Sequence, residues 1–477
     1  MRDSYEIVIG LEVHVELKTA TKIFCNCTTA FGGEPNTHCC PVCLGMPGTL
    51  PVLNEKVVEF AVKAGLATNC EITTHGKQDR KNYFYPDLPK AYQISQYDLP
   101  LCHDGYLDIS VGEHEKRIGI TRIHIEEDAG KLIHDDKGTY IDYNRCGVPL
   151  IEIVSEPDLR SADEVKAYLT KLRSILLFAD VSDCKMNEGS FRCDVNLSVR
   201  KKGELKYGTR TEMKNLNSFA FIAKAIEHET IRQIQLVESG ESVIQETRRW
   251  DQAKGKSFSM RTKEDAHDYR YFPDPDLMPI VVDKKMLADI SGMLPQLPDD
   301  RKRVYIEKYN LTPYVAEQMV MTKITADFFD LCLEKGAEPE TLSKLMMSEV
   351  LRLMGKDGDD GEILLSAPQM IELVQAIATD EINYSIGKKV LEGIWDTDTM
   401  PKVYIEANDM APIKDLALLS KLADDILSQQ PKIIEDFLAG KEKAVQAFIG
   451  QMMRHSKGKA DPDLTSTIFY EKIKAHQ

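Results

Sequence analysis

A row of polar side chains runs along one side of the first predicted strand. Residues 5–17 read Y-E-I-V-I-G-L-E-V-H-V-E-L, with apolar side chains at every second position, the period of a strand with one buried face. Glu12, His14 and Glu16 fall on the opposite face. Neighbours in such a row lie about 6–7 Å apart, so two carboxylates and an imidazole could hold a divalent cation. A solvated outer face is the alternative that this strand alone leaves open.

Clustered cysteines make a second candidate site. Two close pairs lie in a Gly/Pro-rich stretch: Cys25 with Cys27, and Cys40 with Cys43. Two thiolate pairs on turns predict a closed, tetrahedral four-sulfur zinc site of the structural type. Cys39 could replace Cys40 in a shifted register, and His38 could substitute as a ligand. Unliganded thiols and a redox Cys-x-x-Cys are the alternatives.

A carboxylate interrupts a predicted strand that is otherwise apolar. Residues 149–155 read P-L-I-E-I-V-S, so both faces of this strand should be buried. A lone buried carboxylate is expensive unless it is paired or bound to a metal. Glu152 is therefore a strong candidate for a cation ligand.

Two further strand patterns carry polar side chains of the same kinds. The sets that share a face are Arg122, His124 and Glu126 in residues 116–127, and Arg192, Asp194 and Asn196 in residues 189–200. Carboxylates hold Mg²⁺, and arginines clamp the phosphate oxygens that Mg²⁺ also binds. Lys214 precedes a predicted helix over 219–237, whose N-terminal amides attract anions. Because neither common glycine-rich phosphate loop is present, a nucleotide would be bound by side chains and metal on a sheet.

The composition is that of a globular protein with several domains. The chain has 477 residues, of which 43% are hydrophobic, and a net charge of −16. This charge argues against a cationic surface over the whole chain, although a local basic patch remains compatible with it. There is no apolar run long enough for a membrane span and no visible secretory signal, so we expect a cytoplasmic protein with no membrane contact.

The pattern of elements predicts an α+β fold in three parts. Mixed strands and helices fill residues 1–293, with the cysteine stretch as an insertion at 25–43. Helical patterns dominate residues 294–408, and a small helical tail follows over 409–477. Within the tail, residues 441–459 hold five basic side chains and one acidic side chain. This basic segment could contact a phosphate backbone or could be a solvated helix face.

Eight motifs are spread from residue 8 to residue 462. They are V-I-G-L-E-V-H-V-E-L, C-P-V-C-L-G-M-P-G, R-K-N-Y-F-Y-P-D, H-I-E-E-D-A-G-K, G-V-P-L-I-E-I-V-S-E-P-D, K-N-L-N-S, D-Y-R-Y-F-P-D-P-D and Q-M-M-R-H-S-K-G-K-A-D-P. In these motifs the whole chain resembles the GatB family, the B subunits of the tRNA-dependent amidotransferases. The resemblance implies a catalytic domain with a glutamine synthetase-like open sheet, then a helical domain and a tRNA-binding tail.

The resemblance also implies a ligase activity with partners and cofactors. The B subunits of this family use ATP and Mg²⁺ to phosphorylate the side-chain carboxylate of misacylated Glu-tRNA(Gln) or Asp-tRNA(Asn). Ammonia released from glutamine by the amidase, which is the A subunit, then replaces the phosphate, and the small C subunit completes the heterotrimer. Such chemistry needs in-line positioning and neutralisation of oxygen charge by metal and arginine.

Motif by motif, the resemblance assigns roles to residues of this chain. The Mg²⁺ ligands would be Glu12, His14 and Glu152, followed by Glu126 and Asp194. The phosphate contacts would be Arg192 and Lys214. The ammonia path would be lined by Lys81, Lys90 and Glu127. The structural Zn²⁺ ligands would be Cys25, Cys27, Cys40 and Cys43, and the tRNA contacts would be Arg454, Lys457 and Lys459. The choice between Glu126 and Glu127 for the metal site stays open, because adjacent strand residues face opposite ways.

Two alternatives compete with this assignment. The paralogous archaeal GatE proteins carry an additional insertion domain, for which 477 residues leave no room. A non-catalytic, zinc-stabilised tRNA-binding scaffold would keep the cysteines and the basic tail but would not need the carboxylates.

Overall fold

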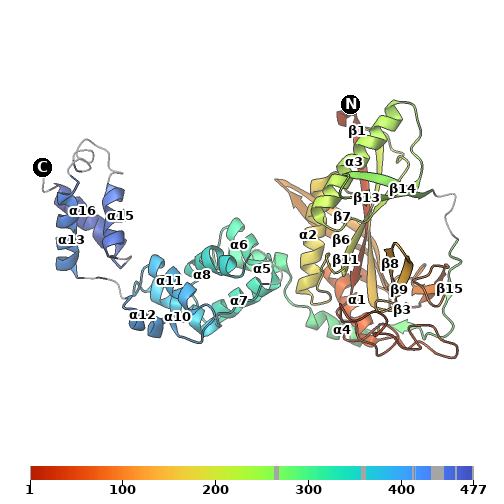
Figure 1. Cartoon of the computed structure of the whole chain (residues 1–477), viewed down its shortest axis with the longest axis horizontal. Helices are drawn as coiled ribbons and strands as arrows, with labels where there is room; N and C mark the ends of the chain where they lie inside the picture. The colour runs from red at the N-terminus through yellow and green to blue at the C-terminus, as the bar shows by residue number, and fades with distance from the viewer. Residues whose placement is uncertain are drawn as a thin grey trace. The chain divides into compact units, whose positions relative to one another are not determined.

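The computed structural model describes residues 2–262, 268–355, 361–410, 413, 415–430, 434, 445–456 and 459–474. The chain divides into two compact units, Met1–Leu297 and Pro298–Gln477, which are described separately below (Figure 1). The first unit contains the strands, and the described elements of the second are helical, so the predicted α+β class is confirmed.

A nine-stranded sheet forms the frame of the first unit. Its strands, in spatial order, are β14 (Lys256–Thr262), β13 (Glu246–Asp251), β12 (Thr211–Lys214), β11 (Phe191–Lys201), β1 (Tyr5–Glu16), β10 (Pro149–Ser155), β7 (His114–Glu127), β6 (Cys102–Val111) and β2 (Glu71–Ile72). All neighbours pair antiparallel except β12 and β13, which are parallel. The first strand, β1, thus lies in the middle of the sheet, and strands that carry polar side chains on the open face lie on both sides of it.

Helices cover one face of this sheet (Figure 1). They are α1 (Glu55–Ala67), α2 (Ala162–Phe178) and α3 (Phe219–Glu238), which pack against β7, β6 and β11 respectively, while α4 (Lys284–Met293) packs on α1. Asn54, Ser161 and Ser218 accept backbone hydrogen bonds at the N-termini of α1, α2 and α3. Because alternate residues of β1 from Ile9 to Val15 are buried in the core, the intervening polar residues face the opposite side.

Three small sheets complete the first unit. Their strands are β15 (Phe272–Pro273), β4 (Asp79–Asn82) and β5 (Tyr92–Ser95); β16 (Ile280–Val281) and β3 (His75–Gly76); and β8 (Lys131–Asp135) and β9 (Gly138–Asp142). The cysteine stretch lies in the irregular segment between β1 and α1.

The second unit has two described groups of helices. The first comprises α5 (Pro298–Glu307), α6 (Pro313–Met319), α7 (Lys323–Glu334), α8 (Pro339–Leu345), the π-helical turn η3 (Met346–Val350), α9 (Leu351–Leu353), α10 (Ala367–Ala378), α11 (Tyr384–Ile394) and α12 (Pro401–Ala407). The second comprises α13 (Leu416–Ser428), α15 (Val445–His455) and α16 (Pro462–Lys474), which share a hydrophobic core. The division of the helical region at residues 408 and 409 stays a prediction.

None of the described helices combines the length and the apolar run that crossing a membrane requires.

Candidate functional site

Polar side chains from five neighbouring strands meet on the face of the main sheet that the helices leave open. The strand register aligns them in two rows. One row runs His124, Glu152, His14 and Arg192 across β7, β10, β1 and β11. The next row runs Arg122, Val154, Glu12 and Asp194 across the same strands. Residues far apart in the sequence therefore become lateral neighbours about 5 Å apart along the sheet.

His14, Glu126 and Glu152 could together hold a cation, because their ligand atoms lie within 4.8 Å of one another, and we call them the first cation-binding group. His14 Nε2 lies 3.4 Å from Glu152 Oε2 and 3.8 Å from Glu126 Oε1. His124 Nε2 lies 3.6 Å from Glu152 Oε2 and 3.7 Å from Glu126 Oε2. The Nδ1 of His124 is buried without a hydrogen-bond partner among the described residues. Ser95 Oγ donates to Glu126 Oε2 at 3.3 Å.

The pKa shifts in this group show that it attracts positive charge. Burial alone would lower the pKa of His14, but the contact with Glu152 and the charge of Glu126 raise it to about 9. Burial alone would raise the pKa of Glu152, and the two histidines beside it instead hold that pKa well below its usual range. Two ionised carboxylates and an imidazole thus converge where a cation could replace the proton on His14.

The second cation-binding group consists of Glu12, Asp194 and Glu212, again with ligand atoms within 4.8 Å. Asn196 Nδ2 donates to Glu12 Oε1 at 2.9 Å. Lys214 Nζ pairs with Asp194 and lies 2.9 Å from Glu212 Oε1. Burial and the charges of Glu152 and Glu212 raise the pKa of Glu12, because negative charge is in excess there. An all-carboxylate set of this kind suits Mg²⁺, which prefers oxygen ligands.

The structure distributes the predicted Mg²⁺ ligands over these two groups. Glu12 lies with Asp194, whereas His14 and Glu152 lie with Glu126. Glu127 points elsewhere: its carboxylate pairs with Lys90 and accepts a hydrogen bond from the Ile94 backbone N–H at 2.8 Å. Of the two adjacent glutamates, Glu126 is therefore the one that lies with His14 and Glu152.

The two predicted phosphate-binding cations are already paired with carboxylates. Arg192 Nη2 lies 2.8 Å from Asp128 Oδ2, and Lys214 is held by the second cation-binding group. Both side chains border the open face of the sheet. Because each is paired, it neutralises a neighbouring carboxylate and is not free to bind a phosphate.

Three residues of the open face were given no role in the sequence analysis. His124 and Arg122 share the polar face of residues 116–127, but their cross-strand neighbours could not be read from the sequence. Glu212 lies two residues before Lys214 on a strand of only four residues. Its alternation with Lys214 is the only sequence signal, and it is too short to stand out.

The four predicted zinc ligands converge. The sulfurs of Cys25, Cys27, Cys40 and Cys43 lie within 4.8 Å of one another. Cys39 is outside the group, and its Sγ instead lies 3.9 Å from Asn144 Oδ1. The hydrogen bond from Cys25 lowers the pKa of Cys43 to about 4. A set of four thiols with one thiolate already favoured fits a tetrahedral structural zinc ion.

The predicted ammonia-path residues occupy two places. Lys90 and Glu127 form a buried ion pair in a cavity of about 120 Å³, which Cys25 and Cys43 also line. Lys81 is not among the residues that line this cavity. Its Nζ lies 5.2 Å from the centre of the Tyr269 ring. Burial alone would lower the pKa of Lys81, but the nearby Glu126 carboxylate raises it, so Lys81 belongs electrostatically to the first cation-binding group.

A second cavity, of about 220 Å³, opens beside Glu12. Its lining includes Val8, Gly10, Val154, Asn196, Tyr207 and Arg210. Apolar side chains and a tyrosine next to a carboxylate group give a mixed surface that suits a small organic ligand.

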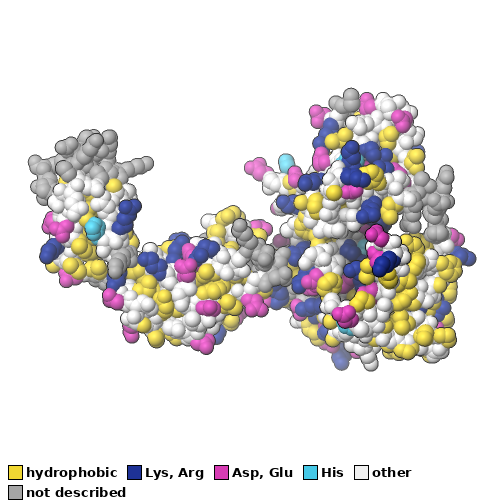
Figure 2. All heavy atoms as spheres, viewed as in Figure 1, with side chains coloured by type: hydrophobic (Ala, Val, Ile, Leu, Met, Phe, Trp, Pro, Cys, Tyr) yellow, Lys and Arg dark blue, Asp and Glu magenta, His cyan; other side chains and the backbone are white. Residues whose placement is uncertain are grey.

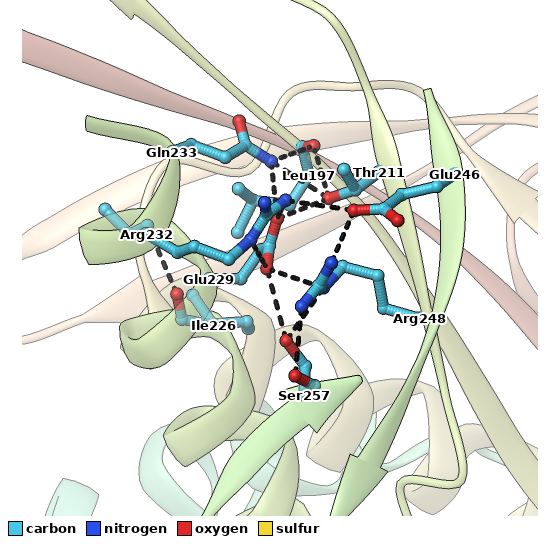
Figure 3. Close-up of polar contacts among 10 residues, drawn as sticks. Leu197, Thr211, Ile226, Glu229, Arg232, Gln233, Glu246, Arg248 and Ser257 are labelled. Atoms are coloured by element: carbon cyan, nitrogen blue, oxygen red, sulfur yellow. Dashed lines mark hydrogen bonds and ion pairs between the residues drawn. The ribbon is translucent and has the colours of Figure 1, made fainter. Parts of the chain in front are cut away.

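A buried network holds the far edge of the sheet in place (Figure 3). Glu229 of α3 has no solvent exposure, and its Oε1 accepts hydrogen bonds from Thr211 Oγ1 at 2.8 Å and Arg232 Nη2 at 2.7 Å. Arg248 of β13 lies 3.5 Å from the other carboxylate oxygen and pairs with Glu246. Thr211 immediately precedes Glu212, so this network fixes the strand that carries a ligand of the second cation-binding group.

Replacing Glu229 with Gln is expected to lower the free energy of unfolding by about 1–3 kcal/mol, because Arg232 and Arg248 would lose one of their two carboxylate partners and keep only Glu246. Urea unfolding of the variant measures this loss. The exposed Glu241, replaced in the same way, is the matched control and should leave the free energy of unfolding unchanged. Equal stability of both variants would show that the network is dispensable.

The predicted tRNA contacts lie in the last helices. Arg454 is exposed in the last turn of α15. Lys459 Nζ lies 2.7 Å from Asp409 Oδ2, and Lys457 lies outside the described residues. On the face that Figure 2 shows, Lys and Arg side chains are interspersed with Asp and Glu. The basic tail contact stays a prediction.

Two family models and several curated relatives match nearly the whole chain. A model described as the GatB/GatE catalytic domain matches residues 7–288, and one described as the GatB domain matches residues 327–473. A relative from Caldicellulosiruptor bescii, named as the B subunit of an aspartyl/glutamyl-tRNA(Asn/Gln) amidotransferase, is 54% identical over 475 residues, which cover 98% of this chain and 99% of the relative. Relatives of the same name from Thermoanaerobacter pseudethanolicus and Geobacter sulfurreducens are 53% and 50% identical, covering 98% and 99% of this chain and 99% and 100% of their own lengths.

Proposed function

The chain belongs to the GatB family of amidotransferase B subunits, and from this premise we propose that it activates and amidates the amino acid on a misacylated tRNA. The substrates would be Glu-tRNA(Gln), Asp-tRNA(Asn) or both. The terminal phosphoryl group of ATP passes to a side-chain carboxylate oxygen, which gives an acyl phosphate and ADP. Ammonia then attacks the acyl carbon and the bond to the phosphate oxygen breaks. The products are an amide and inorganic phosphate, which takes up the proton that ammonia loses.

The observation that carries this proposal is the pair of cation-binding groups side by side on one open sheet face. A carboxylate is a poor electrophile, so its activation demands neutralisation of several phosphate oxygens at once. Mg²⁺ held by these carboxylates would supply that neutralisation. The chain itself prepares the site: Asn196 orients Glu12, and Lys214 holds Asp194 and Glu212 together. The 220 Å³ cavity beside Glu12 would take the nucleoside part of ATP.

The buried Lys90–Glu127 pair supports the proposed route for ammonia. The pair lies in a cavity of about 120 Å³, which is large enough for ammonia and several water molecules. A cation and an anion that line one cavity can relay a polar molecule by accepting and donating hydrogen bonds in turn. The source would be a separate amidase chain, and a small third chain would complete the complex.

Replacing Lys90 with Met is expected to reduce amidation driven by glutamine while leaving amidation with added ammonium salt close to wild type. Removing one partner of a buried ion pair costs about 3–5 kcal/mol, so Glu127 would take up a proton or turn away. Parallel assays with glutamine and with ammonium chloride measure the difference. Lys63, which pairs with Glu59 on α1, is the matched control for a Lys-to-Met change. Equal loss with both nitrogen sources would contradict the assignment.

The cysteine site and the basic tail complete the proposal. Zinc would be structural, because the four sulfurs leave no coordination position for a substrate. Arg454, Lys457 and Lys459 would contact the phosphate backbone of the tRNA.

Amidation by the purified complex, with each misacylated tRNA supplied separately, tests the proposed function. We expect Gln-tRNA(Gln) or Asn-tRNA(Asn) to form together with one ADP for each amide. A complex that binds tRNA tightly but consumes no ATP would support the non-catalytic scaffold instead.

A further inference from the structure

We propose that Arg122 binds the reacting oxyanion on the open sheet face, opposite the second cation-binding group. This inference rests on the proposed function and adds to it a residue that contacts the substrate. The oxyanion is the terminal phosphoryl group of the nucleotide or the carboxylate that receives it. Both present oxygens in the spacing that a guanidinium binds in bidentate fashion.

Arg122 is an arginine whose charge is uncommitted. Within the part of the chain that the structure describes, its side chain makes no ion pair, no hydrogen bond and no aromatic contact, and its Nε is buried without a partner. A single guanidinium N–H that is buried without an acceptor is already costly, so the Nε of Arg122 calls for an explanation. A bound anion would supply the missing acceptors.

The strand register places Arg122 where that anion is needed. Arg122 pairs across the strands with Val154, and Val154 pairs on its other side with Glu12. Neighbouring strands are about 4.8 Å apart, so the backbones of Arg122 and Glu12 are separated by about 10 Å with only a valine side chain between them. The short side chain leaves room above it for a ligand that reaches the arginine on one side and the carboxylate group on the other.

The other cations at the carboxylate groups are committed to them, and Arg210, which lines the cavity beside Glu12, is exposed and so needs no bound acceptor. Arg192 is paired with Asp128, and Lys214 with Asp194. Lys81 lies in the field of Glu126. A phosphoryl group brings several oxygens that carry negative charge, and its transfer is favoured by an arginine that contacts them directly. Arg122 therefore complements the cations that hold the carboxylates in place.

The test compares Arg122→Ala and Arg122→Lys in the purified complex with Arg117→Ala as the matched control. Arg117 lies on the same strand, exposed and paired with Asp108. We expect Arg122→Ala to lower kcat/KM for ADP formation by about 100-fold, the effect of removing one preorganised donor to a developing charge. The kcat/KM of Arg122→Lys should lie between those of Arg122→Ala and wild type, because lysine keeps the charge but lacks the planar pair of N–H donors. Guanidinium ion added to the Arg122→Ala complex should restore part of the activity, which a loss of folding would not allow.

Two binding measurements identify the oxyanion. If it is the phosphoryl group, wild type binds ATP more tightly than ADP, and Arg122→Ala removes that difference. If it is the substrate carboxylate, the preference for ATP survives and KM for the misacylated tRNA rises instead. Activity of Arg122→Ala equal to that of Arg117→Ala, without guanidinium rescue, would overturn the inference. A wild-type complex that forms no ADP would refute the proposed function, and the comparison of ATP with ADP binding would still test Arg122.

Discussion

Replacing Glu152 with Gln is expected to lower ATP-dependent phosphorylation of the misacylated tRNA by about 1,000-fold, the upper range for one electrostatic contact to a developing charge. Glu152 lies 3.4 Å from His14 and 3.6 Å from His124, and it stands in the middle of an otherwise apolar strand. Glutamine keeps the shape but loses the charge that a cation needs. Single-turnover assays with labelled ATP measure the phosphorylation step directly.

The same variant should bind tRNA as tightly as wild type, because Glu152 lies in the sheet unit and not among the proposed tRNA contacts. Glu115 is exposed on the neighbouring strand β7, and Glu115→Gln serves as the matched control. Full turnover of Glu152→Gln with supplied ammonia would refute the role of this carboxylate in phosphorylation.

Replacing Cys43 with Ser is expected to remove zinc and to loosen the cysteine segment. Structural zinc contributes about 10–16 kcal/mol of apparent folding free energy in small zinc-binding peptides, so loss of the proposed ion should destabilise this irregular segment. Cys43 also lines the cavity of the Lys90–Glu127 pair, so glutamine-driven amidation should fall as well. Metal analysis and hydrogen exchange over residues 25–43 measure the two effects.

Cys39 is the matched control for this experiment. It is adjacent in sequence to a proposed ligand but contacts Asn144 instead of the sulfur group. Cys39→Ser should therefore keep one zinc ion per chain and normal protection from exchange. Zinc loss from Cys39→Ser, or full zinc in Cys43→Ser, would show that the ligand register is different.

Strand periodicity was enough to predict which faces carry the polar residues, because every second side chain of β1 must enter the core. It could not decide between Glu126 and Glu127, since that choice depends on which neighbour each residue meets across β10 and β5. The register supplies this information, and it is set by long-range pairing that no local pattern encodes. Glu212 was not predicted as a ligand because β12 has only four residues, too few for the alternation to be recognised.

The convergence of Cys25, Cys27, Cys40 and Cys43 was the easiest part of the site to predict. Their spacing alone brings two pairs of thiols together, and only the choice of Cys40 over Cys39 needed the position of Asn144. Arg122 shows the opposite case. Its face was predicted, but the absence of a partner among the described residues is a property of the folded surroundings and cannot be read from the residues beside it in the sequence.

Transfer of label from ATP to the amino acid is the most direct test of the central claim. The wild-type complex is incubated with ATP labelled at the terminal phosphate and with misacylated tRNA, in the absence of any nitrogen donor, and is then treated with hydroxylamine. We predict ADP, labelled inorganic phosphate and the side-chain hydroxamate of the amino acid in equal amounts, dependent on the misacylated tRNA and absent in Glu152→Gln. The side-chain hydroxamate is measured separately from the α-hydroxamate, which hydroxylamine forms from the aminoacyl ester without ATP. Formation of the side-chain hydroxamate without ADP, or ADP formation that is independent of the aminoacyl group, would contradict the claim that this sheet face phosphorylates the carboxylate.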